Sequence, residues 1–467
     1  MTSAKKKVDF TSGPLLKSMI LYALPIVGVN ILQILFTTAD VAVLGIFTND
    51  QAVAAVGATA VIVNLMIGFF VGLSIAANVV VARCVGAREI EDAKKFVGTA
   101  VVSSLIFGFL LMIFGSLLAE KLLILTKCDP LVLPYATTYL RIYFLGMPIV
   151  MLYNFSAAIL RAVGNTFKPF IFLVCGGVLN ICLNIFFVVV IKIDVAGVAI
   201  ATVSSQAVSA VGCLVLMIKD NGYAKLELKY LRIFKKQLGE ILYIGLPLGI
   251  SKCLFSFSNV LVQSNINVLG DQVMAANSIT KDLDGIIAEA VHGLSTASLA
   301  IISQNYGAKN IKRIKKAMLI SLALVVAVSL FLECVLILFG EQFCSIFTDT
   351  ETVVQYCAVR IKVFSVSIVV LGLLLIIQEG MRAIGYSFSA MLLSIFANII
   401  LRIFYLLWIY PKLFVPTETV TNLYLIYLVY PMSWLVCAIT GVIMFIVMYN
   451  KVKKRFLAQS QEQNQNN

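Results

Sequence analysis

The sequence predicts an all-α integral membrane protein with twelve transmembrane helices in two six-helix, pseudo-symmetric lobes. The first observation is composition: of 467 residues, 61% are hydrophobic and 13% charged, and the mean hydropathy is +1.00. A soluble chain cannot bury so much apolar surface. The second and third observations are a series of long apolar runs and an internal repeat of about 221 residues. Together they exclude a soluble enzyme, a nucleic-acid-binding domain and a disordered regulator.

The apolar runs define the predicted helices. They are too long for barrel strands and lack the alternation that a membrane barrel needs. About 20 apolar residues are enough for a helix to cross the hydrocarbon core. Pro25 and Pro247 are expected to kink or to begin their helices. The predicted spans are Leu15–Ile46, Ala52–Ala82, Phe96–Leu118, Ala136–Leu160, Phe170–Ile191, Val195–Ile218, Ile241–Leu269, Val273–Ile302, Ala317–Phe339, Cys357–Gln378, Ala390–Ile409 and Leu423–Met448.

The charge pattern predicts how the chain is oriented. The formal net charge is +13, and the Lys and Arg residues lie mainly in alternate short loops. That distribution is typical of membrane topology rather than of a nucleic-acid partner. It predicts a multi-pass protein of a bacterial inner or plasma membrane with both termini in the cytoplasm. The predicted parts are a cytoplasmic N-terminal segment (1–14), an N-lobe (15–218), a basic cytoplasmic linker (219–240), a C-lobe (241–450) and a polar cytoplasmic tail (451–467). The part of the tail after Leu457 is rich in Gln and Asn and is expected to be disordered.

The internal repeat predicts two related halves. Residues 86–88 (Gly-Ala-Arg) recur at 307–309 (Gly-Ala-Lys), and residues 160–164 (Leu-Arg-Ala-Val-Gly) recur at 381–385 (Met-Arg-Ala-Ile-Gly). Because each half has an even number of helices, the halves share one orientation about an axis along the membrane normal. Such a bundle can rock about its interface and expose a site to each side in turn. This favours a transporter, although duplication can also be only a way to build a large bundle.

Asp40 is the first polar group that the sequence singles out inside a span. A charged side chain at the centre of a bilayer costs about 2.5–3.5 kcal/mol on the mildest scale, so it needs a proton, a cation or a partner. Gln33 and Thr37 precede it at spacings that place all three on one helix face. The alternative is a structural hydrogen-bond cluster that joins two helices.

Two further helices carry polar pairs four residues apart, Asn180 with Asn184 and Thr202 with Gln206. Alone, each pair is typical of hydrogen bonding between helices in lipid. Together with Asp40 they supply one carboxylate and several neutral oxygens, which could hold a proton or Na⁺.

The second half lacks an acid at the position that matches Asp40, where Asn259 stands. The ion site is therefore expected in the N-terminal half only. The stretch Lys281–His292 is the most charged in-span segment. It contains either a self-neutralising Lys281–Asp284 pair or a second titrating or substrate site. The candidate substrate-cavity residues are Gln33, Thr37, Asn154, Gln206 and Asp284.

The sequence gives no support for an enzyme. No nucleotide-binding loop of the form G-x-x-x-x-G-K-[ST] occurs, and neither do the G-x-S-x-G or H-E-x-x-H motifs. His292 is the only histidine, which excludes a multi-histidine metal site. We expect no cofactor and no metal. Because the nucleotide-binding loop is missing, transport is expected to be either passive or coupled to an ion gradient.

The sequence resembles the multidrug and toxic compound extrusion (MATE) family from about Leu15 to Lys454. Each motif is short, but the ordered set is specific. The motifs are Pro25, Pro247, Thr38-Ala39-Asp40, residues 82–87 with 303–308, residues 160–165 with 381–385, and residues 196–202. The resemblance implies two six-helix lobes around a central cavity, the MATE/MOP-type fold. It also implies export of organic, often cationic or amphipathic, compounds in exchange for H⁺ or Na⁺, by a protein that we expect to be monomeric.

The match to the DinF-like branch of that family implies specific site residues. Its cation site uses an aspartate in helix 1, an asparagine and an aspartate one turn apart in helix 5, and a threonine in helix 6. These carry over to Asp40, Asn180, Asn184 and Thr202. Asn184 departs from the pattern, because an amide replaces the second carboxylate and lowers the negative charge by one. The branch with acids in helix 7 is not matched, since residues 249–267 contain none.

Two other functions stay open at this point. A lipid-linked oligosaccharide flippase of the same superfamily would need a cationic cavity, for which Lys252, Lys281 and Arg402 are candidates. A membrane-embedded transferase would need clustered acids at one membrane face, and the sequence shows none.

Overall fold

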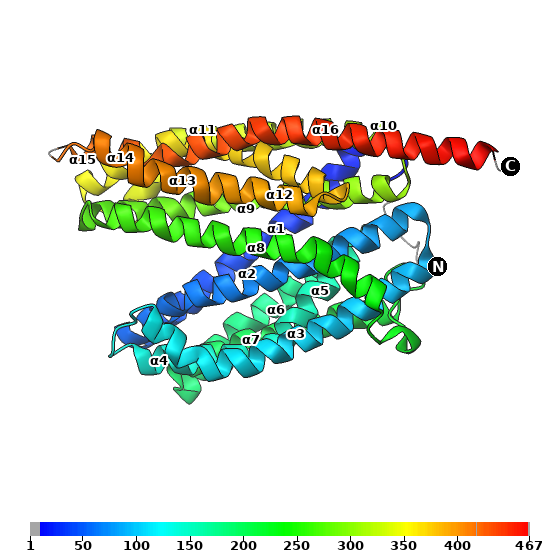
Figure 1. Cartoon of the computed structure of the whole chain (residues 1–467). Coiled ribbons are helices and arrows are strands. Elements are labelled where there is room, and N and C mark those ends of the chain that lie inside the picture. The colour runs from blue at the N-terminus through cyan, green and yellow to red at the C-terminus, as the bar shows by residue number, and fades with distance from the viewer. Residues whose placement is uncertain (1–9, 417, 466–467) are drawn as a thin grey trace. The chain divides into compact units, whose positions relative to one another are not determined.

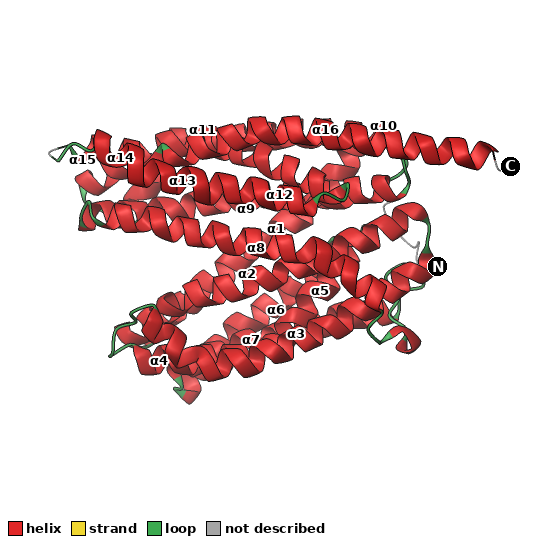
Figure 2. Cartoon of the chain, viewed as in Figure 1, coloured by secondary structure: helices red, strands yellow, loops and turns green. Residues whose placement is uncertain are grey.

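The computed structural model describes residues 10–416 and 418–465, and its described part consists of helices and short connections without strands (Figures 1 and 2). The chain divides into two compact units, Met1–Gly249 and Ile250–Asn467. The division falls inside α8, while the sequence repeat starts the second lobe at residue 241.

The first unit contains seven α-helices, one π-helical segment and one 3₁₀ turn in its described residues. They are α1 (Leu15–Phe47), α2 (Asp50–Ala87), α3 (Ile90–Leu125), α4 (Leu133–Leu145), α5 (Met147–Ala162), α6 (Phe167–Ile185), η1 (Phe186–Ile191), α7 (Asp194–Ile218) and η2 (Leu228–Tyr230). Within this unit α6 packs against α1 and α7, and α5 packs against α2, α3 and α7.

The second unit begins within α8 and is likewise helical throughout its described residues. Its elements are α8 (Lys235–Asn267), α9 (Asp271–Gly307), α10 (Ile311–Ser345), α11 (Glu351–Ala383), α12 (Ser387–Ile395), η3 (Phe396–Ile400), α13 (Leu401–Phe404), η4 (Tyr405–Ile409), α14 (Tyr410–Leu413), α15 (Thr419–Tyr427) and α16 (Val429–Gln465). Its central helix is α11, which packs against α9, α10 and α16.

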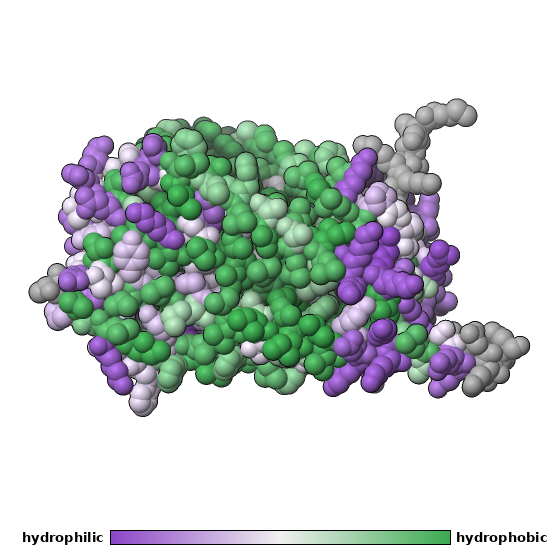
Figure 3. Space-filling model, turned by 90° about the horizontal axis from the view of Figure 1, so that it is seen from above, coloured by the Kyte–Doolittle hydropathy of each residue, from purple (hydrophilic) through white to green (hydrophobic). Residues whose placement is uncertain are grey.

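The number of membrane-crossing helices agrees with the sequence. Among the described residues, eleven helices are long and apolar enough to cross a bilayer. A twelfth is formed by α4 and α5 together, which bend by 52° at the break between them. On the face shown in Figure 3, hydrophobic residues fill a broad middle band and hydrophilic residues gather at both ends. This is the surface expected of a multi-pass membrane protein.

The repeated motifs are helix ends. Arg88 follows α2 with φ 62°, and Lys309 follows α9 with φ 53°. Gly164 follows α5 with φ 83°, and Gly385 follows α11 with φ 99°. A left-handed residue after a helix lets backbone N–H groups bond to the last carbonyls of that helix. The repeat at about 221 residues therefore preserves two chain reversals in each half.

Two expectations about the helix bounds are wrong. The alternative in which the prolines begin their helices is wrong, since Pro25 lies inside α1 and Pro247 inside α8, whereas the alternative in which they kink them stays a prediction. The tail after Leu457 is not disordered as far as Gln465, because α16 continues to that residue, and residues 466–467 lie outside the described part of the chain. Gln, Glu and Ala are good helix formers, and adding residues to an existing helix avoids the cost of nucleation.

The linker between the last helix of the first half and α8 is held against α3. Glu227 accepts a hydrogen bond from the Lys94 ammonium at 2.7 Å and lies within 4 Å of the Lys225 and Lys229 ammonium groups. The hydrogen bond from Lys94 lowers the pKa of the Glu227 carboxyl. A Cβ on Gly98 would lie 1.9 Å from the Tyr230 carbonyl oxygen, so this glycine allows the linker to approach α3 closely.

Candidate cation-binding site

The candidate site lies where α6 approaches both α1 and α7. Two consecutive glycines make this approach possible. A Cβ on Gly177 would lie 1.7 Å from the Phe36 ring of α1, and a Cβ on Gly176 would lie 2.4 Å from Ser209 Oγ of α7. Since successive helical residues point about 100° apart, each glycine serves a different neighbouring helix. Asn180 and Asn184 follow on the next two turns of α6.

The four residues of the predicted cation site are together in the structure. Asn184 Nδ2 donates to Asp40 Oδ1 at 2.5 Å, and Thr202 Oγ1 lies 3.2 Å from Asp40 Oδ2. Asn180 joins both, because its Nδ2 lies 3.4 Å from Thr202 Oγ1 and its Oδ1 accepts from Asn184 Nδ2 at 3.3 Å. The four side chains therefore form one hydrogen-bonded cluster across three helices.

The electrostatics of this cluster suit a cation. Asp40 is only 5% exposed, and in the described part of the chain none of the ion pairs involves it. Asn184 is fully buried, and its Oδ1 has no hydrogen-bond donor among the described residues. A buried carboxylate beside an unsatisfied amide oxygen needs a proton or a positive ion. The cluster can therefore bind H⁺ or a hard cation that prefers oxygen ligands.

Two features of the surroundings were not predicted. Tyr139 and Tyr143 of α4 lie near enough to Asp40 to interact with it electrostatically, and their rings stack with centroids 6.0 Å apart. Their spacing of four residues places both tyrosines on one face of α4, and it was the only feature of the sequence that could have indicated them. In addition, the π-helical segment η1 begins two residues after Asn184. π-helical turns are frequently found at functional sites.

The structure places the predicted substrate-cavity residues of the first unit on three helices, α1, α5 and α7. Gln33 and Thr37 are exposed on α1, unlike Asp40, so the polar stripe is not buried along its length. Half-buried Asn154 donates to the Val150 carbonyl at 2.9 Å. Gln206, also half-buried, lies one turn after Thr202, and its Oε1 has no donor among the described residues.

The fifth residue, Asp284, is buried in the second unit, and its predicted pairing with Lys281 is wrong. Asp284 Oδ2 lies 3.0 Å from Arg360 Nε of α11, whereas Lys281 is exposed. Arg360 also donates to Asn277 and places its guanidinium 4.3 Å from the centroid of the Phe364 ring. A buried charge needs a buried partner, and Lys281 points elsewhere on α9. The sequence reasoning missed Arg360, whose only signal was a cation inside an apolar run.

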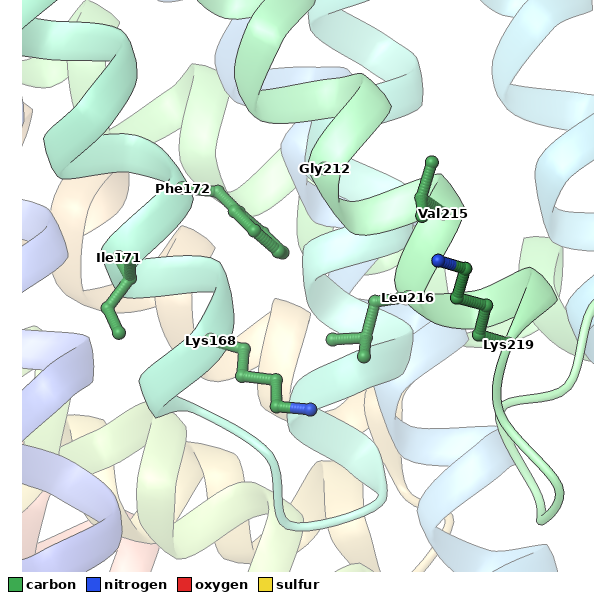
Figure 4. A pocket seen from close by; sticks show the side chains of 7 residues that line it. All are labelled: Lys168, Ile171, Phe172, Gly212, Val215, Leu216 and Lys219. Atoms are coloured by element: carbon green, nitrogen blue, oxygen red, sulfur yellow. The ribbon is translucent and has the colours of Figure 1, made fainter. Parts of the chain in front are cut away.

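A cavity of about 450 Å³ lies between α6 and the end of α7 (Figure 4). Lys168 and Lys219 flank apolar side chains there, and none of the predicted site residues lines it. The lining residues are Lys168, Ile171, Phe172, Gly212, Val215, Leu216 and Lys219.

Comparison with known proteins identifies the family. A family model described as MatE matches the chain twice, at residues 25–186 and 247–408. The chain belongs to the MatE family. Its two matches start 222 residues apart (247 minus 25), which confirms the internal repeat. Membership of MatE, a family of transporters, also confirms that the protein is a transporter and not an enzyme.

Individual relatives agree with the MatE assignment. A protein of Bacillus subtilis (strain 168) named "Probable multidrug resistance protein YpnP" is 30% identical over 66% of this chain and 69% of its own length. A second protein of the same organism, named "Probable multidrug resistance protein YoeA", is 27% identical over 90% of this chain and 94% of its own length. A solved outward-facing structure of a multidrug resistance MATE family transporter has a TM-score of 0.88 at 21% identity, covering 97% of this chain and all of the other. That likeness confirms the predicted MATE/MOP-type fold.

Proposed function

We propose that this MatE protein is a secondary antiporter that exports organic, cationic or amphipathic compounds in exchange for H⁺ or Na⁺. It works by alternating access in the bacterial plasma membrane, with both termini in the cytoplasm. Relatives named as multidrug resistance proteins support the substrate class. The alternate basic loops of the sequence support the orientation.

The observation that carries the ion coupling is the buried Asp40 cluster. Its carboxylate is hydrogen-bonded by residues of α6 and α7, so a proton or Na⁺ bound there competes with the contacts that join α1 to both helices. Ion binding drives transport only if the ion prefers one conformation, because equal affinity for both shifts nothing. We infer that ion entry from outside repacks α1, α6 and α7, which contracts the first lobe and releases the exported compound outward.

The experiment is efflux of ethidium and of a fluoroquinolone from drug-sensitive bacteria, with the H⁺ and Na⁺ gradients collapsed separately. The wild-type protein is compared with Asp40→Asn. That variant keeps the shape of the side chain and removes its charge, so we expect normal membrane insertion without export. Dependence on one gradient names the ion.

Two outcomes would contradict the proposal in different ways. Export by Asp40→Asn at the wild-type rate would remove Asp40 from the coupling step. No export of any organic cation by a well-inserted wild type, combined with rescue of cell-envelope assembly, would favour the lipid-linked oligosaccharide flippase.

A further inference from the structure

The second unit contains a buried arginine without an acidic partner. Arg402 lies in the four-residue segment α13, is 0% exposed and takes part in none of the ion pairs among the described residues. Its Nη1 donates to Ser258 Oγ at 2.9 Å and to Asn259 Oδ1 at 3.1 Å, both on α8. A guanidinium is always charged, so this unit holds an uncompensated positive charge at membrane depth.

The unused donors of Arg402 are the pair that recognises oxyanions. Nε and Nη2 lie on one edge of the guanidinium, where their N–H groups are parallel and match the two oxygens of a carboxylate. Both atoms are buried and have no hydrogen-bond partner in the described part of the chain. Ser258 and Asn259 hold the opposite edge through Nη1, which orients this fork.

The surroundings add a third donor and an apolar lining. Trp434 Nε1 is also buried without a partner among the described residues, and the Arg402 guanidinium carbon lies 5.4 Å from the centroid of the Trp434 ring. The same carbon lies 4.5 Å from the Tyr430 ring centroid and 5.8 Å from that of Phe255. Buried donors that lack acceptors are rare in native proteins. An organic anion would supply the acceptors, and its apolar body would pack against the rings.

The repeat relates the position of this arginine to the cation cluster of the first unit. The two family matches are offset by 222 residues, and the same offset carries Asn180 to position 402. At this offset Asp40 corresponds to Val262, which lies one helical turn after Ser258 and Asn259 on α8. The second half thus has a guanidinium in place of the Asn180 amide and no carboxylate in place of Asp40. A site that attracts cations in one half has a counterpart suited to anions in the other.

The backbone around Arg402 provides a place for the site to open. The π-helical segments η3 and η4 flank α13 directly on both sides. Such turns are frequent at functional sites. Arg402 and Trp434 are 0% and 2% exposed, so the fork is closed in this structure and a ligand enters when α13 separates from α8 or α16.

We propose that Arg402, with Trp434, forms a binding site for the carboxylate of an organic ligand. The further statement that exported compounds carry this carboxylate rests on the export proposed above. On that statement, the protein exports zwitterionic and anionic compounds through the Arg402 site in addition to simple cations.

Binding can be tested without transport, because the chain has two tryptophans. Trp408 is 63% exposed, so Trp408→Phe leaves Trp434 as the only tryptophan reporter. The full-length variant in lipid nanodiscs is titrated with benzoate, with benzamide as the neutral control of the same shape, and with chloride. We expect a saturable change in tryptophan fluorescence with benzoate alone.

Several results of this titration would overturn the proposed site. Equal responses to benzoate and benzamide, or none to either, would overturn the site, and neither result needs a change at Arg402. A chloride response as strong as that of benzoate would indicate an inorganic-anion site and would overturn the organic carboxylate. Adding Arg402→Gln to the reporter variant should weaken benzoate binding at least tenfold. Arg402→Lys, which keeps the charge but loses the fork, should also weaken it.

Transport then tests the substrate class. Export of a carboxylate-bearing fluoroquinolone should fall at least tenfold in Arg402→Gln, whereas export of its methyl ester and of ethidium should stay at the wild-type rate. Equal export of the acid by both proteins would overturn the substrate statement. If the wild type exports none of these compounds, the proposed export fails, while the fluorescence titration still decides the binding site.

Discussion

Replacing Asn184 by Asp is the most informative change at the cation cluster. Asn184 Nδ2 donates to Asp40 Oδ1 at 2.5 Å in a site with a single carboxylate. The substitution keeps the side-chain size, removes this hydrogen bond and adds a second negative charge. We expect the variant to bind a cation, H⁺ or Na⁺, more tightly than the wild type.

The size of the effect follows from the separation of the two groups. With the amide nitrogen 2.5 Å from Asp40 Oδ1, the two carboxylates would be centred a few ångströms apart. Two unit charges about 4 Å apart interact by about 4 kcal/mol at an effective dielectric constant of about 20. A monovalent cation bound between them relieves that repulsion. Its affinity should therefore rise by up to about 4 kcal/mol, or about three orders of magnitude in Kd.

The assay is uptake of Na⁺ and of protons by the purified protein, titrated separately. Asn184→Leu is the matched control, since it removes the same hydrogen bond without adding charge. Any tightening that it shows measures the loss of that hydrogen bond, and the excess in Asn184→Asp measures the added charge. Uptake of both ions by Asn184→Asp within about threefold of wild type would refute the electrostatic reasoning. Tighter binding should also slow export, because a strongly held ion leaves the site less often.

Three further changes test neighbouring features. Gly177→Ala puts a Cβ 1.7 Å from an aromatic ring of α1 and should lower the free energy of unfolding by about 1–3 kcal/mol. Gly57→Ala is the control, because the space around Gly57 is open, and it should not lower this free energy. The melting temperatures of both variants in detergent, compared with that of the wild type, test this prediction. Thr202→Val removes a hydroxyl that donates to the site carboxylate. Because that hydrogen bond favours the charged carboxylate and competes with a bound proton, its loss should tighten proton binding by about twofold to about 150-fold, the equivalent of a hydrogen bond that contributes about 0.5–3 kcal/mol. Thr202→Ser should restore the wild-type affinity in the same uptake assay. Since the hydrogen bond from Lys94 lowers the pKa of Glu227, that contact persists at pH 7 and weakens only as the pH falls through the lowered pKa. In Glu227→Gln this contact is weakened at every pH, so the backbone amides of the linker should be less protected from hydrogen exchange than those of the wild type at pH 7. The wild type should lose this protection only in acid. Equal protection in the two proteins at pH 7 would contradict this reasoning.

Much of the candidate site was predictable because its members follow simple helical spacing. Asp40 was conspicuous as an acid in an apolar run, and Asn180 and Asn184 share a face of α6. Thr202 was a candidate through its spacing with Gln206, and the resemblance to the MATE family chose it rather than Gln206 for the cation site. Nothing in the spacing showed that Asn184 leaves one acceptor unsatisfied, since that depends on how closely α1 approaches α6.

Pairings across the second unit were not predictable in the same way. Asp284 has Lys281 three residues before it, yet its partner is Arg360 on another helix. Local spacing places two side chains on one face but does not determine whether that face is buried. The two donors of Arg402 that lack acceptors among the described residues could not be predicted either, because their lack of acceptors depends on which helices surround the side chain.

The sequence by itself determined the fold class, the number of spans, the repeat and the family, because long apolar runs and recurring helix ends are local properties. It could not determine the continuation of α16 through the polar tail, the positions of Pro25 and Pro247 inside their helices, or the partner of Asp284. Tertiary structure decided these, and it alone distinguished a carboxylate cluster in one half from an unpaired guanidinium in the other. The physical reason is that a buried charge is satisfied by whichever polar group the packing brings within hydrogen-bond distance, however far away it lies in the chain.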